Sequence, residues 1–538
     1  MSLHSKVLTA LGVAAALASG SAHAAGLVSP GNQFLISGST ALDNQIKDAL
    51  LLPPPSGPCK AGTISIYTDA PAVAGGNLTK AHQTTVVCTL AADIGTGASK
   101  VAANTVVAFT KESNGGSNEG TFYEAAQQKL TFFDATQAPT GCTDEGAIAA
   151  GHYWTHQQAI ADEQDGCTGA LIQAIPQIGV ADEDPAVFNL GLQAISPALI
   201  ANLNTTPLFQ NQFGIVVSLN LYRKLQTAQG LTQDDTLANM PSLTKQTIAG
   251  LLSGVNTDWS AVSGAGVSGQ VYVCRRGQNS GTETSADIFF LGNRCISGNA
   301  SMALDVAGTI PGTTGPCAGL PGGQTPENNG CTWTNGAAPG GNLSDTVFAG
   351  TATGDVLSCL DAHSRAGTYA IGFSGTTSKF DDPLGATGAA GEPGTNHWRY
   401  IAYDGNKPTV AGMANGTYAY AMDNVENVWT GLTGQPLSVA TYLGTVFQDP
   451  TALEDILVAQ PNAQNAAHTA DPNFVTGGLL DALNNAGIPQ NTVPVATSTL
   501  QGAGGGNPVS GLTRAPLGGV TNCQPAVAVG PSLPKEQF

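Results

Sequence analysis

The sequence is poor in charge, and basic residues are especially scarce. Lysine and arginine together number 19 among 538 residues, against 38 aspartates and glutamates, which gives a formal net charge of −19. A nucleic-acid partner is therefore not expected, because no basic stripe is present to neutralise a phosphate backbone. The charged fraction of 11% is far below the ~25% of an ordinary globular chain. A local cationic pocket would stand out against this background.

Long apolar runs are also scarce. After the N-terminus, no run reaches the roughly 18–20 consecutive apolar residues of a membrane span. The chain starts with a short polar segment, an apolar segment at 7–18 and a small-x-small pattern at 22–24, which together predict an export signal over residues 1–24. No cysteine follows this predicted cleavage site, so we expect no lipid anchor and no direct membrane anchor. The mature chain is expected to be periplasmic or secreted.

Neither the Cys-x-x-Cys spacing of zinc sites nor that of redox sites occurs, yet ten cysteines are present. In an exported chain an even number of cysteines favours disulfides. Pairing of sequence neighbours suggests Cys59–Cys88, Cys142–Cys167, Cys274–Cys295 and Cys317–Cys331, with Cys359–Cys523 as the remainder. The same spacings are compatible with other pairings, so this set is a hypothesis.

Strand patterns alternate with helix patterns along most of the chain, which predicts an α/β fold with open sheets. In three places, at 33–50, 104–126 and 271–291, a strand runs through a loop of small polar residues into a helix. This geometry points the free N–H groups of a helix start at one spot, where an anion can bind. Each loop is equally compatible with an ordinary turn and a capped helix.

Other strands and helices are expected between and after these three units. The expected strands are 64–67, 84–90, 175–180, 213–219, 369–373, 400–403 and 416–422. The expected helices are 222–226, 244–254, 356–362, 439–447 and 452–458.

Two polar side chains near these loops would suit a tetrahedral anion. Arg276 supplies a permanent charge on a planar fork that matches an oxyanion. Asp182 follows a strand, and its carboxylate could accept a hydrogen bond from a protonated oxyanion and would repel a fully deprotonated one. A solvated acidic turn before Pro185 explains Asp182 equally well.

Two segments interrupt the pattern. Residues 134–170 and 297–345 are rich in turn residues and contain cysteines, so we expect them to be disulfide-stapled insertions. His152 and His156 stand four residues apart, a spacing that could bind a metal ion on a helix. Exposed polar residues on a surface helix are the plainer interpretation, because a third ligand is missing, and no metal site is assigned.

Several motifs, in this order, resemble the periplasmic phosphate-binding protein of the phosphate ABC importer. Ile36–Ala41 and Ser113–Ser117 resemble the first two binding loops of that family, and Ala181–Asp182 resembles its strand-end aspartate. Leu243–Ser260 is similar to its helix and tryptophan segment, and Arg276–Thr282 to its Arg-x-Asp-x-Ser-Gly-Thr loop. The match covers about residues 33–460.

The resemblance implies a two-lobed type II periplasmic-binding-protein fold with a ligand cleft between the lobes. One lobe would consist of 25–215 and the returning segment 416–490, and the other of 216–415. Residues 491–538 would form a Gly/Pro-rich C-terminal tail.

The resemblance also implies roles for individual residues. Ser39 and Thr40 would donate hydrogen bonds from a helix start, Ser113 or Ser117 would donate from the second loop, and Asp182 would accept a hydrogen bond from the ligand's proton. Arg276 would supply charge, and the residues that donate around it would be Ser280, Gly281 and Thr282. Two residues depart from the family pattern: Gln278 replaces an aspartate, and Glu112 lies beside a loop that is glycine-rich in the family. Both changes weaken the expectation of phosphate selectivity.

The sequence therefore predicts an exported binding protein for phosphate or a similar tetrahedral oxyanion, with an ABC permease as a possible partner. No cofactor and no catalytic residue are expected. The alternative is a secreted surface or matrix protein that reuses this scaffold and could self-assemble, because fold does not fix function. A phosphate-ester hydrolase fits less well, since no nucleophile–base pair or metal cluster stands near the loops.

Overall fold

The computed structural model has a mixed α/β fold, which confirms the predicted class. Among the described residues, no helix combines the length and apolar character needed to cross a membrane. The structure describes residues 28–448, together with 512–513, 523 and 527–528, outside these gaps: 30, 53, 70–81, 114–115, 138–142, 149–150, 158–166, 169–170, 191–192, 263, 278, 296–300, 304–345, 351–352, 376–396 and 409–416.

One part of a large mixed sheet is formed by the first third of the chain. Its strands are, in spatial order, β6 (Thr143–Ile148), β7 (Gly151–Gln157), β2 (Ile64–Thr68), β3 (Gln83–Thr89), β4 (Val106–Glu112), β1 (Gln33–Gly38) and β10 (Ile178–Ala181). β1 is parallel to both β4 and β10, whereas β3 is antiparallel to both β2 and β4. Three strand ends therefore meet at one edge of this part of the sheet, beside the loops after β1, β4 and β10.

Apolar side chains from these strands form the first core. Phe34, Ile36 and Phe109 are buried there together with residues of α1 (Asp43–Leu51) and of α9 (Gly434–Gln448), which returns from much later in the sequence. α1 has the predicted spacing, because Leu42, Ile46 and Leu50 are all buried in this core.

The middle of the chain forms the second core. Its strands are β11 (Leu203–Ser218), β15 (Tyr369–Gly375), β13 (Val271–Arg276) and β14 (Val347–Gly350), with β16 (Trp398–Tyr403) beside β11 and β12 (Ser242–Leu243) beside β16. Its helices are α4 (Leu219–Ala228), α5 (Lys245–Leu252), α6 (Gly281–Ala286) and α7 (Thr353–Arg365). Trp259 is fully buried after α5, as predicted, and donates from its indole nitrogen to the carbonyl oxygen of Tyr369.

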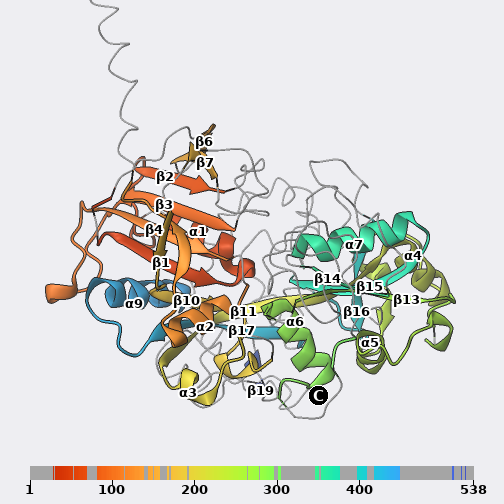
Figure 1. Cartoon of the computed structure of the whole chain (residues 1–538). Coiled ribbons are helices and arrows are strands. Elements are labelled where there is room, and N and C mark those ends of the chain that lie inside the picture. The colour runs from red at the N-terminus through yellow and green to blue at the C-terminus, as the bar shows by residue number, and fades with distance from the viewer. Residues whose placement is uncertain are drawn as a thin grey trace, which may run out of the picture.

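Two long antiparallel strands connect the two cores. β17 (Ala421–Trp429) lies between β10 and β11. The first half of β11 pairs with β17, and its second half pairs with β15, with a shift in register between Pro207 and Gln210. Figure 1 shows β11 and β17 running from the part that contains β1–β4 to the part that contains β13–β16.

The predicted strand 416–422 was wrong in position, because it overlaps β17 only at Ala421 and Met422. β17 continues through Asp423, Asn424, Glu426 and Asn427, all buried, which hides the strand from a hydrophobicity pattern. Tertiary hydrogen bonds satisfy the side chain of Asn427, whereas the buried amide of Asn424 has no hydrogen-bond partner among the described residues. Asn427 donates to the carbonyl oxygen of Gly120 at 2.9 Å and accepts from Thr205 Oγ1 at 2.9 Å.

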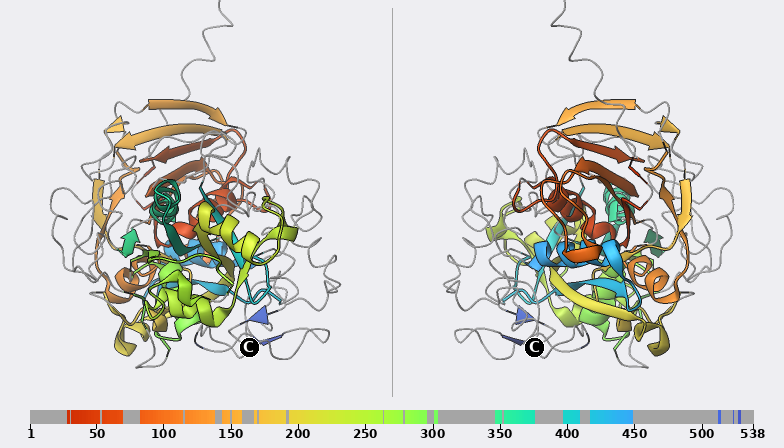
Figure 2. Two further views of the ribbon diagram at one scale, coloured as in Figure 1. Left: turned by 90° about the vertical axis from the view of Figure 1, so that its right-hand side faces the viewer. Right: turned by 90° about the vertical axis from the view of Figure 1, so that its left-hand side faces the viewer.

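The insertion at 134–170 contains strands in the described residues, which corrects the expected surface helix. His152 and His156 lie on β7, which pairs with β2 and extends the sheet. Both views in Figure 2 show β6 and β7, in orange, beyond the red strands near the N-terminus. The remaining short elements are α2 (Glu119–Ala126), α3 (Pro197–Ile200), β5 (Leu130–Phe133), β8 (Cys167–Thr168), β9 (Leu171–Ala174), β18 (Leu512–Thr513) and β19 (Val527–Ala528).

Three disulfides join described residues. The predicted Cys59–Cys88 bond is confirmed. The predicted Cys274–Cys295 and Cys359–Cys523 bonds are wrong, because Cys274 bonds Cys359 and Cys295 bonds Cys523. Sequence proximity failed here because α7 packs across β13 and brings the Cα atoms of Cys274 and Cys359 to 6.0 Å across a separation of 85 residues.

Several predictions fall outside the described residues. These are the export signal at 1–24, the helix at 452–458, Gln278, the Cys142–Cys167 pair through its first member, and the Cys317–Cys331 pair with most of its insertion at 297–345.

Candidate anion-binding site

Close backbone packing fixes the loops that follow β1 and β10. Gly38 has φ +109°, and a Cβ built on it would lie 2.0 Å from the carbonyl oxygen of Val180 and 2.6 Å from the Cα of Gly120. A Cβ on Gly120 would lie 2.2 Å from the same carbonyl oxygen. No side chain larger than hydrogen fits at either position. The end of β1, the end of β10 and the start of α2 therefore pack backbone against backbone.

Four of the predicted site residues meet at one point beside this joint. Ser39 Oγ donates to Asp182 Oδ1 at 2.6 Å, and Ser117 Oγ donates to Asp182 Oδ2 at 2.9 Å. Gly281, from the second core, faces the same groups: a Cβ built on it would lie 2.3 Å from both Asp182 Oδ2 and Ser117 Oγ. Ser39, Ser117 and Asp182 are each at most 2% exposed. Segments from four places in the sequence thus close around one carboxylate.

Direct contacts also join the second and third loops. The backbone N–H of Asn118 donates to the carbonyl oxygen of Asn279 at 3.1 Å, and Asn118 Nδ2 lies 3.3 Å from Asn279 Oδ1. Gln193 accepts from the Asn279 side chain at 3.2 Å through Oε1, and its carbonyl oxygen accepts from Asn118 Nδ2 at 3.0 Å. These three residues were missed from the sequence. An amide side chain in each of two small-residue loops is a usable signal for such a contact.

The structure separates Ser113 from Ser117. Ser113 Oγ donates to Asp43 Oδ2 at 3.0 Å, near the start of α1, whereas Ser117 contacts Asp182. Lys111, also missed from the sequence, ion-pairs with Asp43 and donates to the carbonyl oxygens of Gly38 and Ser39, both at 2.9 Å. The sequence signal for this cation was a lysine near the end of a strand that is otherwise largely apolar. Burial raises the pKa of the Asp43 carboxyl, and Lys111 opposes that rise.

Arg276 lies at the end of β13 and is 1% exposed. Its Nη1 donates to Thr353 Oγ1 at 3.3 Å, at the start of α7, and its backbone N–H donates to Glu283 at 3.1 Å. The neighbouring Arg275 ion-pairs with Glu283. The carboxylate of Glu283 therefore binds the side chain of Arg275 and the backbone of Arg276, which joins the start of α6 to the end of β13.

The other predicted donors lie on the same loops. Thr40 begins a short 3-10 turn, Thr40–Leu42, and is partly exposed. Ser280 and Thr282 are buried at the start of α6, where their carbonyl oxygens accept from Thr284 Oγ1 at 3.0 Å and from Ser285 Oγ at 2.8 Å. Glu112, one of the departures from the family pattern, is buried at the end of β4.

Glu183 follows Asp182 and is completely buried. Neither of its carboxylate oxygens has a hydrogen-bond partner among the described residues. Burial raises the pKa of Glu183 well above its usual range, the charge of Asp182 raises it further, and Arg294 acts in the opposite direction. When Glu183 is neutral, one negative charge fewer lies beside Asp182, and the electrostatic repulsion of an anion at this position is weaker.

Two hydroxyl donors, one carboxylate acceptor and a close-packed glycine therefore lie together. The hydroxyls can donate to anionic oxygens, and the carboxylate can accept from a protonated one. Among the described residues, Cys274, Cys359 and His363, on β13 and α7, are the one group of three side chains close enough to hold a metal ion.

No protein-family model matches this chain, and no curated protein matches it. Several solved structures of phosphate-binding or phosphate-transport proteins resemble it. A candidate phosphate ABC transporter substrate-binding protein from Clostridium perfringens, with bound phosphate, is 12% identical over 80% of this chain and 98% of that chain, with a TM-score of 0.37. An ABC-type phosphate transport receptor from Vibrio cholerae is 14% identical over 53% of this chain and 79% of that chain, with a TM-score of 0.28. A phosphate-binding protein from Stenotrophomonas maltophilia is 14% identical over 55% of this chain and 79% of that chain, with a TM-score of 0.30.

Proposed function

We propose that this chain is an exported solute-binding protein that captures phosphate or a similar tetrahedral oxyanion, with an ABC permease as its partner. The observation that carries the proposal is the meeting of Ser39, Ser117 and Gly281 around Asp182. These residues come from loops that were each singled out as anion loops. Residues from the segments of both cores contribute to this cluster. A protein that binds its ligand between two lobes has the same arrangement.

In the proposed bound state the hydroxyl protons of Ser39 and Ser117 turn from Asp182 toward oxygens of the anion. Each hydroxyl has a single proton, so it donates either to Asp182 or to the ligand. Asp182 then accepts a hydrogen bond from the proton that the anion carries. Thr40, Ser280, Gly281 and Thr282 donate from their loops, and Arg276 supplies the balancing charge. Ser113 acts indirectly, by holding Asp43 beside Lys111.

This arrangement discriminates between anions by their protonation. Phosphate and arsenate keep a proton near pH 7 and can donate a hydrogen bond through it to Asp182. Sulfate has none to give and would place its charge directly against the carboxylate, a repulsion that is strong in a buried site. We therefore expect phosphate and arsenate to bind and sulfate to be rejected.

Calorimetry on phosphate-stripped protein tests the proposal. Phosphate, arsenate, sulfate and molybdate are titrated into the wild type and into Asp182→Asn, which keeps the shape of the side chain and removes its charge. Phosphate should bind the variant at least about tenfold more weakly, the scale of one lost charged hydrogen bond, while the preference against sulfate shrinks. Asp93→Asn, an exposed aspartate paired with Lys100, is the matched control. No heat with any anion in the wild type would refute the function.

The domain division remains part of this proposal. We assign 25–215 and 416–490 to one lobe, 216–415 to the other, 1–24 to an export signal and 491–538 to a tail. The two separate cores support a division into two parts, although Val187, Phe188 and Ile195, assigned to the first lobe, are buried in the second core. The boundary at 215 lies inside β11, close to the passage from Leu208 in the first core to Phe213 in the second, whereas the passage back along β17 lies between Val425 and Val428, after the boundary at 416.

One observation favours the second candidate, a secreted structural protein. The Ser39 and Ser117 hydroxyls already donate to Asp182, and Gly281 closes over them, so the ligand's donors are satisfied within the chain. A scaffold that no longer binds an anion would be expected to look like this. Folded, monodisperse protein that binds none of the four anions, together with filaments of the chain in culture medium by electron microscopy, would support this candidate over the first.

A further inference from the structure

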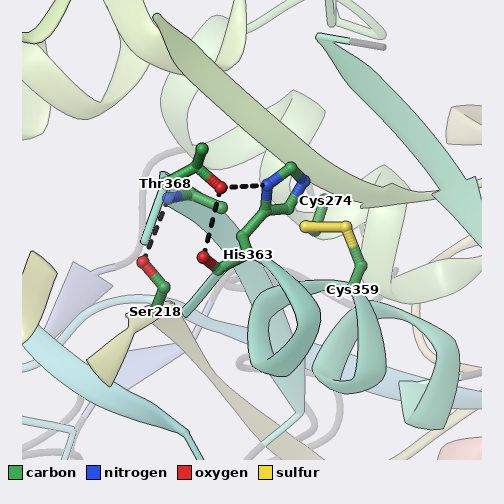
Figure 3. Close-up of a disulfide and its surroundings, with 6 residues drawn as sticks. Ser218, Cys274, Cys359, His363 and Thr368 are labelled. Carbon is green, nitrogen blue, oxygen red and sulfur yellow. Dashed lines mark hydrogen bonds between the residues drawn. A yellow bond between two sulfur atoms is a disulfide. The ribbon is translucent and has the colours of Figure 1, made fainter. Parts of the chain in front are cut away.

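One grouping of potential metal ligands lies outside the candidate anion site. Cys274 on β13 and Cys359 on α7 form a disulfide, and His363 follows Cys359 by one helical turn. The ligand atoms of the three residues all lie within 4.8 Å of one another, and the three side chains are at most 4% exposed. Figure 3 shows the imidazole of His363 directly beside the disulfide.

The hydrogen bonds of His363 select the ring nitrogen that faces the sulfurs. Thr368 Oγ1 donates its one hydrogen bond to the carbonyl oxygen of His363 at 3.1 Å. The hydroxyl oxygen of Thr368 is therefore the acceptor in its contact with His363 Nδ1, at 2.9 Å. The proton of the neutral ring is therefore on Nδ1, and Nε2 carries the lone pair. In Figure 3 Nδ1 points to Thr368, and the other ring nitrogen lies on the side of the sulfurs.

This arrangement matches the supporting shell of a metal-binding histidine. Such a ligand donates its second ring N–H to an oxygen, which fixes its tautomer and orientation. The ring of Tyr272 also packs on the imidazole, with 4.4 Å between ring centroids.

We propose that reduction of the Cys274–Cys359 disulfide creates a binding site for one thiophilic d¹⁰ ion, Zn²⁺ or Cu⁺, held by Cys274, Cys359 and His363. Thiolate and imidazole ligands select such ions. Tetrahedral zinc places its sulfur ligands about 3.8 Å apart. The two sulfurs, bonded to each other in the oxidised chain, therefore separate on reduction, and the imidazole already lies within 4.8 Å of them.

The chemistry balances with a phosphine as reductant. The phosphine attacks one sulfur, the S–S bond breaks, and water supplies the oxygen of the phosphine oxide and the protons of the two thiols. Binding of Zn²⁺ then forms two Zn–S bonds and one Zn–N bond and releases both thiol protons. The disulfide and the metal are alternative ways of joining β13 to α7, one for an oxidising and one for a reducing environment.

The test uses the full chain, reduced with a phosphine and supplied with Zn²⁺ from a chelator buffer. Bound zinc per chain is measured after gel filtration for the wild type, for Cys274→Ser/Cys359→Ser and for Cys59→Ser/Cys88→Ser. The last variant is the matched control, because it removes a disulfide of the same chain without the neighbouring histidine. Reduced wild type and the control should hold one equivalent of zinc that Cys274→Ser/Cys359→Ser lacks.

Two milder variants keep the test decisive if the cysteine variant fails to fold. His363→Gln should weaken zinc binding at least about tenfold, and Thr368→Val by about tenfold, the scale of a lost supporting contact. Co²⁺ in place of Zn²⁺ should show thiolate-to-cobalt charge transfer in the reduced wild type, with an altered ligand-field spectrum in His363→Gln. The assignment is overturned if reduced wild type takes up no zinc, if oxidised wild type binds it as tightly, or if His363→Gln matches the wild type in affinity and spectrum.

Discussion

Replacing Gly281 by alanine tests the contact between the second core and Asp182. The added Cβ would lie 2.3 Å from Asp182 Oδ2, 2.3 Å from Ser117 Oγ and 2.6 Å from Asp182 Cβ. All three distances are far inside van der Waals contact. Asp182 and Ser117 are buried and bonded to each other at 2.9 Å, so neither can move away without giving up that bond. The start of α6 must shift instead.

Overpacking of a buried contact by one methyl group costs about 1–3 kcal/mol. Gly281→Ala should therefore lower the free energy of unfolding by this amount. If the anion is bound in the same closed arrangement, the same strain weakens phosphate binding by roughly 5- to 150-fold, since each 1.4 kcal/mol is a factor of ten.

Urea denaturation measures the first effect and calorimetry the second. Gly444→Ala is the matched control, because Gly444 lies in helix α9 and a Cβ there would have no neighbour closer than 3.6 Å. Alanine in a helix should leave stability unchanged or raise it by about 0.5–1 kcal/mol. A Gly281→Ala protein as stable as the wild type would show that α6 does not press on Asp182 and would remove the basis of the candidate site.

Three further predictions concern charge, pH and cross-linking. Arg276→Ala should weaken phosphate binding at least about tenfold in calorimetry, the scale of one lost charged hydrogen bond. Burial raises the pKa of Glu426 from 4.5 to about 8, so the folded chain keeps a proton that the unfolded chain loses above its own pKa. The free energy of unfolding should therefore fall as pH rises from about 4.5 to 8, and Glu426→Gln should reduce that fall in urea titrations. Cys59→Ala/Cys88→Ala opens a loop spanning 29 residues and should lower stability by about 3–4 kcal/mol in the same assay.

Each of these has a result that would contradict it. Unchanged phosphate affinity in Arg276→Ala would remove this arginine from the site. Parallel stability curves for Glu426→Gln and the wild type between pH 5 and pH 8 would mean that Glu426 titrates normally in the folded chain. A cysteine variant as stable as the parent would mean that the loop is constrained by packing alone.

The separation of Ser113 from Ser117 shows where sequence reasoning reaches its limit. Both serines lie in the same small-residue loop, so the motif alone left the register open. The choice is made by the close packing of Gly38, Gly120 and Val180, which sets the start of α2 beside Asp182. Such packing depends on segments that are distant in sequence.

The two wrong disulfides have the same origin. Proximity in sequence is a fair guide only within a hairpin, and Cys59 and Cys88, near the ends of such an excursion, were paired correctly. Cys274 pairs instead with a helix that packs across its sheet, and Cys295 with a residue near the C-terminus.

The amino-acid sequence by itself determined the class of the fold, most of the buried strands and helices, and the loops that carry Ser39, Asp182 and Gly281. Periodic burial, turn residues and helix starts are local properties, so they can be recognised without coordinates. Only the tertiary structure decided that β11 and β17 connect the two cores, that Ser117 rather than Ser113 contacts Asp182, and that His363 lies beside a disulfide. Each of these depends on which distant segments pack together, and that is set by the whole chain at once.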